Sequence, residues 1–362
     1  MSRSVLFVGE QQSNALVYYR QVIPGSALAR LGWKVRFAPA LAEMPDGLLV
    51  GMRPGFPPAP VSDVIVTRHI TGVDGIVDSS DLILNARRNG QRVFYDLDDD
   101  LWELPEHNPA FVFYSPEMLA VLNANLAACD GVLVSTPTLA AAVRKHTATP
   151  VTVAPNGILV DPWPRAERRR KHVRVGWLGL MDFRADDLAM IRDPLAAAFE
   201  ANRSARFVHC GAHSAKGSIR ELLGPWPVEI DEVEWVAFHD LGHQLAGHLD
   251  VAVIPMRSSH LNDSRSPTTG LALAACGIPF VASSTPAYRE LARNVPGVRL
   301  VKDGGNWEKA VAGLIADAEA GNLPSTGAMR GGVVLHYRPE VVAMAWARVL
   351  SSYRPLPVGL SH

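Results

Sequence analysis

The sequence has few cysteines, no long apolar run and almost no net charge. Three cysteines occur in 362 residues, at Cys129, Cys210 and Cys276. Each lies in an apolar segment, and their spacing fits no metal-binding motif, so we expect buried, reduced thiols and no metal site. No stretch reaches the roughly 18 apolar residues of a membrane-spanning helix, and the apolar N-terminal run is too short for a secretory signal. We therefore expect a cytoplasmic protein.

The charge balance and several missing motifs argue against other broad classes. With 35 Lys and Arg against 36 Asp and Glu, the net charge of −1 gives no sign of a nucleic-acid or membrane partner. The turn after the first apolar run is not Gly-x-Gly-x-x-Gly, and the chain has no P-loop, no Gly-x-Ser-x-Gly elbow and no catalytic-cysteine signature. Dinucleotide-dependent enzymes, P-loop enzymes and enzymes with a serine or cysteine nucleophile are therefore disfavoured.

Short apolar runs alternate with helix-period segments along the chain, which predicts parallel sheets joined by crossover helices. The length exceeds that of a typical single core and favours two domains. We expect a Rossmann-like domain in residues 1–164, a charged linker in 165–172, a second Rossmann-like domain in 173–338, and a C-terminal helix in 339–362 that packs back on the first domain. The predicted fold class is α/β, with two doubly wound domains facing a central cleft.

The predicted elements follow this alternation. Strands are expected at Val5–Val8, Lys34–Ala38, Asp63–Thr67, Arg92–Asp96, Gly131–Ser135, Val151–Ala154, Val173–Leu178, Ala205–Cys210, Val233–Val236, Val251–Ile254 and Phe280–Ala282. Helices are expected at Val17–Leu31, Leu82–Asn89, Pro116–Ala128, Asp187–Ala201, Leu241–His248, Thr268–Cys276, Pro286–Ala292, Trp307–Ala318 and Pro339–Ser352. Ligands of such folds bind beyond the carboxyl ends of the strands, so the strand ends are where a site is expected.

One strand end carries a pattern typical of an anion site. The strand Val251–Ile254 leads through a polar loop at Asn262–Thr269 into the small-residue helix Thr268–Cys276. The first N–H groups of a helix lack partners and its dipole favours an anion, while Arg265 and the neighbouring hydroxyls add donors. A second arginine, Arg184, precedes another predicted helix after a glycine-containing strand end. These features predict phosphate binding, although a solvated arginine and simple strand-to-helix packing are the alternatives.

Three strand ends in the first half also carry polar residues. Asp96-Leu97-Asp98-Asp99-Asp100 places four carboxylates after one strand, Arg68-His69 follows another, and a turn that begins with Gly9 follows the first. Crowded carboxylates raise one another's pKa and can bind hydroxyl groups or a metal ion, but an ordinary acidic turn that caps the next helix is an equal alternative. The histidine is either structural or in contact with a ligand.

The order of these motifs resembles that of the two-domain (GT-B) nucleotide-sugar glycosyltransferases, in particular the retaining "glycosyl transferases group 1". The residues that carry the resemblance are Tyr19-Arg20 with Pro24, Tyr95–Asp99, Ser135-Thr136, Pro155–Gly157, Val175–Gly179, Asp186–Leu188, Asp250–Pro255, Arg265–Pro267, Ala274–Ser283 and Tyr288. They extend over nearly the whole chain. The resemblance implies a hexosyl- or pentosyltransferase that uses a nucleoside-diphosphate sugar as donor and needs no further cofactor.

The resemblance also implies roles for individual residues. It assigns the reaction centre to Arg265, Arg184, His69 and Asp98. The donor would contact Gly9, Glu10, Gly179, Leu180, Phe238, Ser266, Pro267, Thr268 and Thr269, with the diphosphate at the last four. The acceptor would contact Asp99, Asp100 and Arg68, and could be a glycan, a lipid, a protein or a modified nucleobase.

The sequence departs from the family at two positions. Members commonly carry two glutamates eight residues apart around the helix that begins near Thr268, where this chain has Ser264 and Ala272. Since the second glutamate usually holds the ribose hydroxyls, three alternatives remain beside sugar transfer. They are a sugar-nucleotide epimerase of the same fold, a non-catalytic nucleotide-sugar or glycan-binding module, and, more weakly, a protein that acts on nucleic acid through the basic linker.

Overall fold

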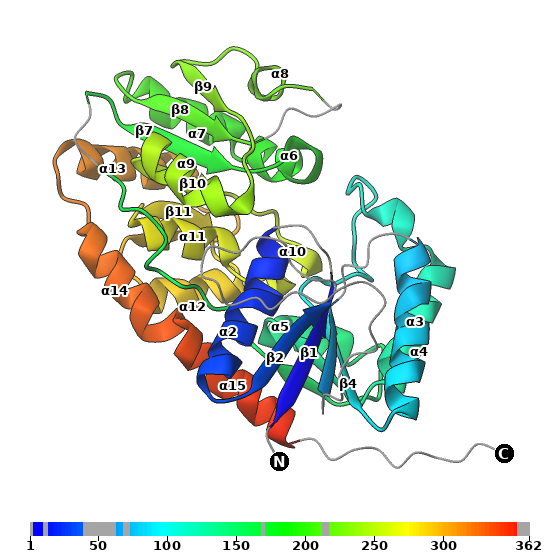
Figure 1. The fold of residues 1–362 in the computed structure, drawn as a ribbon. Helices are drawn as coiled ribbons and strands as arrows, with labels where there is room; N and C mark the ends of the chain where they lie inside the picture. Colours follow the sequence, from blue (N-terminus) through cyan, green and yellow to red (C-terminus); the bar gives the residue numbers. More distant parts are fainter. Residues whose placement is uncertain are drawn as a thin grey trace.

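The computed structural model describes residues 3–9, 14–38, 63–67, 73–167, 171–211 and 217–352, and within these ranges the strands form two six-stranded parallel sheets. This confirms the predicted α/β class with two Rossmann-like units. Figure 1 shows the second sheet and its helices, coloured green to orange, stacked on the unit that holds the first sheet, coloured blue to teal. No helix in the described ranges is both long and apolar enough to cross a bilayer.

The first sheet has the strand order β2-β1-β3-β4-β5-β6. Its strands are β1 (Ser4–Val8), β2 (Lys34–Ala38), β3 (Asp63–Thr67), β4 (Arg92–Leu97), β5 (Gly131–Val134) and β6 (Val151–Val153). Its helical segments are α1 (Ala15–Val17), the π-helix η1 (Tyr18–Val22), α2 (Ile23–Arg30), α3 (Val73–Arg88), the 3-10 turn η2 (Phe111–Phe113), α4 (Pro116–Ala128) and α5 (Pro137–Val143). Both β1 and β5 are buried along their whole length, as apolar strands covered by helices on two faces must be.

The second sheet has the order β9-β8-β7-β10-β11-β12, which is the Rossmann arrangement with a reversal between β7 and β10. Its strands are β7 (Arg174–Leu178), β8 (Arg206–Cys210), β9 (Ile230–Val233), β10 (Val251–Ile254), β11 (Phe280–Ser283) and β12 (Val298–Val301). Its helices are α6 (Met181–Ala189), α7 (Arg192–Glu200), α8 (Ile219–Leu223), the 3-10 turn η3 (Phe238–Asp240), α9 (Leu241–His248), α10 (His260–Ser264), α11 (Thr268–Cys276), α12 (Pro286–Asn294), α13 (Trp307–Glu319) and α14 (Thr326–Tyr337).

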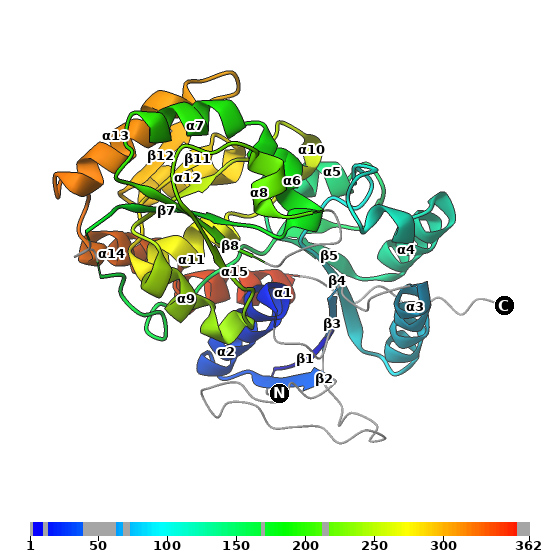
Figure 2. The same cartoon turned by 90° about the horizontal axis from the view of Figure 1, so that it is seen from above.

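The last helix, α15 (Pro339–Ser352), returns from the second unit to the first. Figures 1 and 2 place it beside α2, on the face of the first sheet opposite α3 and α4. Its Trp346 is fully buried in the core cluster that contains Val5 and Phe7, and its ring centroid lies 6.2 Å from that of Phe7. The Trp346 indole N–H donates to the Pro155 carbonyl at 3.3 Å. The C-terminal helix is therefore part of the first unit's core.

Several local predictions were wrong, each for an identifiable reason. The strand expected at Val233–Val236 lies three residues earlier as β9, an edge strand whose apolar pattern is weak. The helix expected at 187–201 is two helices, because Pro194 fits only the first turn of a helix, and α7 begins two residues before it. Part of the expected polar loop folds as the short helix α10, whose N-cap Ser259 accepts a hydrogen bond from the Asn262 N–H at 3.1 Å.

Other segments were mistaken in extent or missed. Helix α3 begins nine residues before the predicted start at Leu82, and α5, α8, α14 and β12 were not predicted. The predicted first helix is confirmed, but it contains the π turn η1 directly before Pro24. Proline cannot donate the helical hydrogen bond, and a wider turn accommodates its ring, which explains why Pro24 widens this helix without ending it.

We predict that Trp346→Ala lowers the free energy of unfolding by about 3–5 kcal/mol, because it removes a fully buried indole from the first unit's core. Urea unfolding followed by circular dichroism measures this change. The matched control is Met344→Ala on the same helix, where the side chain is 61% exposed and the expected change is within about 0.5 kcal/mol. Equal effects of the two substitutions would contradict the burial of α15.

Candidate functional site

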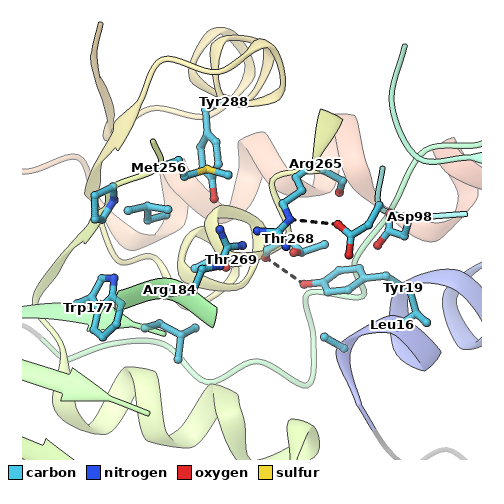
Figure 3. A pocket seen from close by; sticks show the side chains of 16 residues that line it. Leu16, Tyr19, Asp98, Trp177, Arg184, Met256, Arg265, Thr268, Thr269 and Tyr288 are labelled. Carbon is cyan, nitrogen blue, oxygen red and sulfur yellow. Dashed lines mark hydrogen bonds and ion pairs between the residues drawn. The ribbon is translucent and has the colours of Figure 1, made fainter. Parts of the chain in front are cut away.

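A cavity of about 230 Å³ lies between the two units at the carboxyl ends of β7 and β10, where the strand order of the second sheet reverses. This is the place where open α/β sheets bind ligands. The opposite wall comes from α1, η1 and the segment after β4. The lining residues, most of them labelled in Figure 3, are Ala15, Leu16, Tyr19, Asp98, Asp99, Trp177, Leu178, Arg184, Ile254, Pro255, Met256, Arg265, Ser266, Thr268, Thr269 and Tyr288.

Two arginines line the cavity from the second unit and share one acceptor. The Asn262 side-chain oxygen accepts from Arg184 at 3.3 Å and from Arg265 at 3.2 Å. The Asp187 carboxylate accepts from Arg184 at 3.0 Å and from the Asn262 amide at 3.1 Å, which fixes the arrangement. Burial and the neighbouring Arg265 lower the pKa of Arg184. Two guanidinium groups held this close create a positive potential that favours an anion.

The N-terminus of α11 faces the same cavity. Thr268 and Thr269 in its first turn line the wall, and none of the described side chains caps the helix at Pro267. The first N–H groups of α11 therefore have no intrahelical partner and belong to the residues that form this wall. Gly270 lets the helix approach its neighbours closely, since a Cβ there would lie 2.7 Å from a Leu291 methyl group and 2.8 Å from the Tyr288 ring. The helix start thus adds backbone donors to the side of the cavity that holds the arginines.

Contacts across the cavity join the two units. The Arg265 Nε donates to the Asp99 carboxylate at 3.1 Å, and the Tyr19 hydroxyl donates to the Thr268 carbonyl at 3.2 Å (Figure 3). The Thr136 hydroxyl donates to the Ser264 carbonyl at 2.6 Å. In this arrangement a carboxylate of the first unit neutralises one of the two cations in the wall of the second.

A buried charge pair fixes the first unit's wall. Arg20 is completely buried, forms a bidentate ion pair with Asp96, and donates to the Asn156 side-chain oxygen at 2.9 Å. The Asn156 amide in turn donates to the Ser266 hydroxyl at 2.8 Å and contacts the Asp98 carboxylate at 3.4 Å. Burial raises the pKa of Asp98 to about 6, and the negative charge of Asp99 adds to this rise while Arg20 opposes it. Asp98 is thus a half-buried carboxyl whose pKa lies well above its usual range.

The structure brings together seven of the residues that the sequence singled out. Those lining the cavity are Arg184, Arg265, Asp98, Asp99, Ser266, Thr268 and Thr269. Pro267 is the N-cap of α11, Gly179 and Leu180 directly follow the lining residue Leu178, and Gly9 is buried at the end of β1. Glu10, Arg68 and His69 lie outside the described residues.

Two predicted contacts lie elsewhere. Asp100 is 2% exposed and does not line the cavity with Asp98 and Asp99. Burial and the negative charge of Glu103 raise its pKa, while Lys145 and His146 oppose this rise. Phe238, expected beside the donor base, packs in an aromatic cluster with Tyr18 at 4.8 Å and Trp163 at 5.9 Å between ring centroids. The three carboxylates that follow β4 therefore lie in different surroundings. Among the described residues no group of three or more His, Cys, Asp or Glu side chains is placed to hold a metal ion.

Several lining residues were not assigned a role from the sequence. Tyr19 and Tyr288 belonged to the resemblance, but nothing in their spacing showed that they face a common space. Trp177 stacks on the buried His209 with 5.0 Å between ring centroids, and the His209 ring nitrogen contacts the Gly179 carbonyl at 3.0 Å. For Trp177, its place in β7 beside the reversal was the signal available.

The two positions that depart from the family pattern contribute no charge to the cavity. The Ser264 hydroxyl is buried and donates to the Leu261 carbonyl at 2.8 Å, and Ala272 is 2% exposed within α11. Neither residue lines the cavity. A ribose bound here would therefore have to find its hydrogen-bond partners at other residues.

Comparison with solved structures identifies the architecture. Sucrose-phosphate synthase from Thermosynechococcus elongatus is 14% identical, with a TM-score of 0.64 over 96% of this chain and 98% of that chain. The Anabaena protein HepE, solved with UDP-glucose, is 13% identical, with a TM-score of 0.66 over 96% of this chain and 99% of that chain. The chain has the GT-B fold.

A third GT-B neighbour extends this likeness. AviGT4, a glycosyltransferase involved in avilamycin A biosynthesis, is 12% identical, with a TM-score of 0.61 over 96% of each chain. No protein-family model matches the sequence, and no curated protein matches it. The predicted GT-B architecture is thus confirmed by the fold, at a sequence identity of 12–14% to these three structures.

We predict that Asp98→Asn raises the thermal unfolding midpoint at pH 8 and that this gain shrinks towards zero at pH 4. Because the pKa of Asp98 rises from 3.8 to about 6 on folding, the native state is penalised once the carboxyl ionises. The native state is stabilised relative to the unfolded state while the Asp98 carboxyl is neutral. This stabilisation is fully present below pH 4 and is lost as the pH rises through 6. Differential scanning calorimetry at both pH values checks this, and an equal gain at the two pH values would contradict it.

Proposed function

We propose that the protein is a glycosyltransferase that moves a sugar from a nucleoside-diphosphate sugar to an acceptor, with retention of configuration. The observation that carries this proposal is the juxtaposition of Arg184, Arg265 and the start of α11 on one wall of a cavity whose other wall holds Asp98 and Asp99. A diphosphate matches the first wall in charge and in hydrogen-bond acceptors. The GT-B fold and the UDP-glucose bound to HepE support the choice of donor class.

The proposed reaction depends on stabilising the leaving diphosphate. When the bond between the sugar and the diphosphate breaks, negative charge grows on the phosphate oxygens. Arg184 and Arg265 are held before the reaction by Asn262 and Asp187, and the N–H groups of α11 belong to a formed helix, so little reorganisation is needed to stabilise that charge. In a retaining reaction a donor phosphate oxygen can take the acceptor proton on the same face, and no side-chain base is required.

The carboxylates of the first unit are proposed to hold the reacting hydroxyl group of the acceptor next to the donor, whichever surface binds the rest of the acceptor. Asp98 and Asp99 face the arginines across the cavity, where hydroxyl groups of an incoming molecule would donate to them. Asp100 no longer belongs to this set, because it is buried away from the cavity. His69 and Arg68 stay proposals from the sequence. The acceptor class is a glycan, a lipid, a protein or a modified nucleobase.

One observation favours a second candidate, a nucleotide-sugar-binding module without turnover. At positions 264 and 272, where related sequences carry carboxylates, the structure has a hydroxyl that is bonded to its own helix and a buried methyl group. The two candidates differ in one measurement. Release of free nucleoside diphosphate from a nucleotide sugar is expected of the transferase, whereas the binding module would bind the donor and release none.

We predict that Arg265→Ala weakens binding of UDP or GDP by about 10- to 100-fold, since it removes a charge-assisted contact to phosphate. A thermal-shift screen measures this, because a ligand at about 100 times its Kd stabilises the native protein by about 2.7 kcal/mol. The control is Arg206→Ala, which removes an arginine that pairs with Glu229 and Asp231 at the far edge of the second sheet and should leave the shift unchanged. Equal shifts in both variants, or no response of the wild type to any nucleoside diphosphate, would overturn the proposal.

We also predict that Asp99→Asn strengthens binding of the same nucleoside diphosphate by about three- to tenfold. The Asp99 carboxylate occupies Arg265 in the absence of an anion, so its removal ends a competing ion pair and a repulsive charge. Isothermal titration calorimetry gives the two Kd values, with Asp193→Asn, an exposed carboxylate on α7, as the control. Weaker binding by the Asp99 variant would show that this carboxylate helps to hold the nucleotide.

A further inference from the structure

A second cavity of about 300 Å³ adjoins the first and is also built from both units. The first unit contributes Pro105, His107 and Asn108 from the segment after β4. The second unit contributes residues of α6, α10 and the connection after β10, among them Phe183, Asp186 and Arg257. Pro105, His107, Asn108, Phe183, Asp186 and Arg257 are not among the residues proposed to bind phosphate. The sequence did not predict a second cavity.

The two cavities meet at the arginine pair. Arg265 lines both of them, and Asn262, which accepts from Arg184 and Arg265, lines the second. A diphosphate bound to the arginines in the first cavity would therefore lie next to the contents of the second. The second cavity is placed to hold a group that reacts at the end of the diphosphate.

The lining of the second cavity favours a hydroxyl-rich ligand. Asp186 contacts His107 at 3.4 Å and Arg257 at 3.4 Å, distances longer than those of strong charge-assisted hydrogen bonds, so these groups can exchange their weak mutual contacts for hydrogen bonds to the hydroxyl groups of a ligand. Ser258 adds an exposed hydroxyl. Phe183 is 40% exposed, and its ring offers an apolar face against which the C–H face of a sugar ring can pack. Most of the lining residues are polar or charged, which suits a ligand that carries many hydroxyl groups.

The same lining argues against the other acceptor classes. An acyl chain would bury Asp186, Arg257 and Arg265 against hydrocarbon without hydrogen-bond partners, which is costly. A nucleic acid would bring phosphates towards the carboxylates of Asp186 and Asp187, which lie on this wall. The volume is near the lower end for small-molecule pockets and suits a single sugar ring better than a folded polypeptide segment.

We propose that this second cavity is the acceptor subsite and that the acceptor is a carbohydrate, bound through its hydroxyl groups by Asp186, His107 and Arg257 and through its ring by Phe183. The proposal rests on the proposed glycosyltransferase function, because it takes the first cavity as the donor site. It replaces the open choice of acceptor with one chemical class and assigns contacts to four residues that the resemblance did not single out for the acceptor.

Saturation-transfer NMR with a panel of methyl glycosides, recorded with the wild-type protein saturated with UDP or GDP, tests the proposal. At least one glycoside should bind together with the nucleotide. Its Kd should rise about tenfold in Phe183→Ala and again in Asp186→Asn, because each variant removes one contact type. The control is Leu335→Ala on α14, a 65% exposed side chain outside both cavities, which should not change the Kd. Nucleotide binding should be equal in all four proteins.

The outcomes separate this proposal from the function on which it rests. If a nucleotide binds but no glycoside does, the carbohydrate acceptor is wrong while the donor site stands. If UDP-glucose binds and displaces a glycoside that UDP leaves in place, the second cavity holds the donor sugar and the acceptor subsite is overturned. If neither UDP nor GDP binds, the proposed function fails and the acceptor subsite with it. Glycoside binding that is unchanged in Phe183→Ala and Asp186→Asn also overturns the proposal.

Discussion

The buried charge of Arg20 is the constraint on which the geometry of the cleft depends. A guanidinium group with no exposure to water is tolerated only when charge and hydrogen-bond partners surround it, and Asp96, Asn156 and the Ala154 carbonyl meet this need. The Trp346 ring lies 4.8 Å from the guanidinium carbon and covers it from the C-terminal helix. One side chain thus fixes η1, the end of β4, the segment after β6 and α15 relative to one another. Removal of either partner of such a pair costs about 3–5 kcal/mol, so the sequence has little freedom here.

Hydrogen bonds connect Arg20 to the opposite wall of the cleft. Asn156, held by Arg20, donates to Ser266 in the other unit, next to the arginine that pairs with Asp99. Cations and backbone donors then lie on one wall and carboxylates on the other, at a separation that direct hydrogen bonds span. The Arg265–Asp99 ion pair therefore joins the two walls through a charge for which a phosphate would compete. A bound anion that took over Arg265 would weaken this contact between the units.

Sequence patterns predicted the features that depend on local chemistry. Apolar runs gave most of the strands, and the polar loop before a small-residue helix singled out Arg265 and Thr268, both of which line the cavity, because a helix start after a polar loop has a recognisable local pattern. The failures concern packing between distant segments. Adjacent carboxylates lie in different environments, so Asp100 is buried while Asp98 and Asp99 face the cleft. Edge strands such as β9 bury too little to leave a clear pattern.

The central claim is that the wall formed by Arg184, Arg265 and the start of α11 is a diphosphate site. A crystal structure of the protein with a bound nucleoside diphosphate tests it most directly. The account predicts phosphate oxygens within roughly 3 Å of the Arg265 guanidinium and of the first N–H groups of α11, with Asp99 displaced from its 3.1 Å contact. A nucleotide whose phosphates lie away from α11, with the Arg265–Asp99 pair intact, would contradict it.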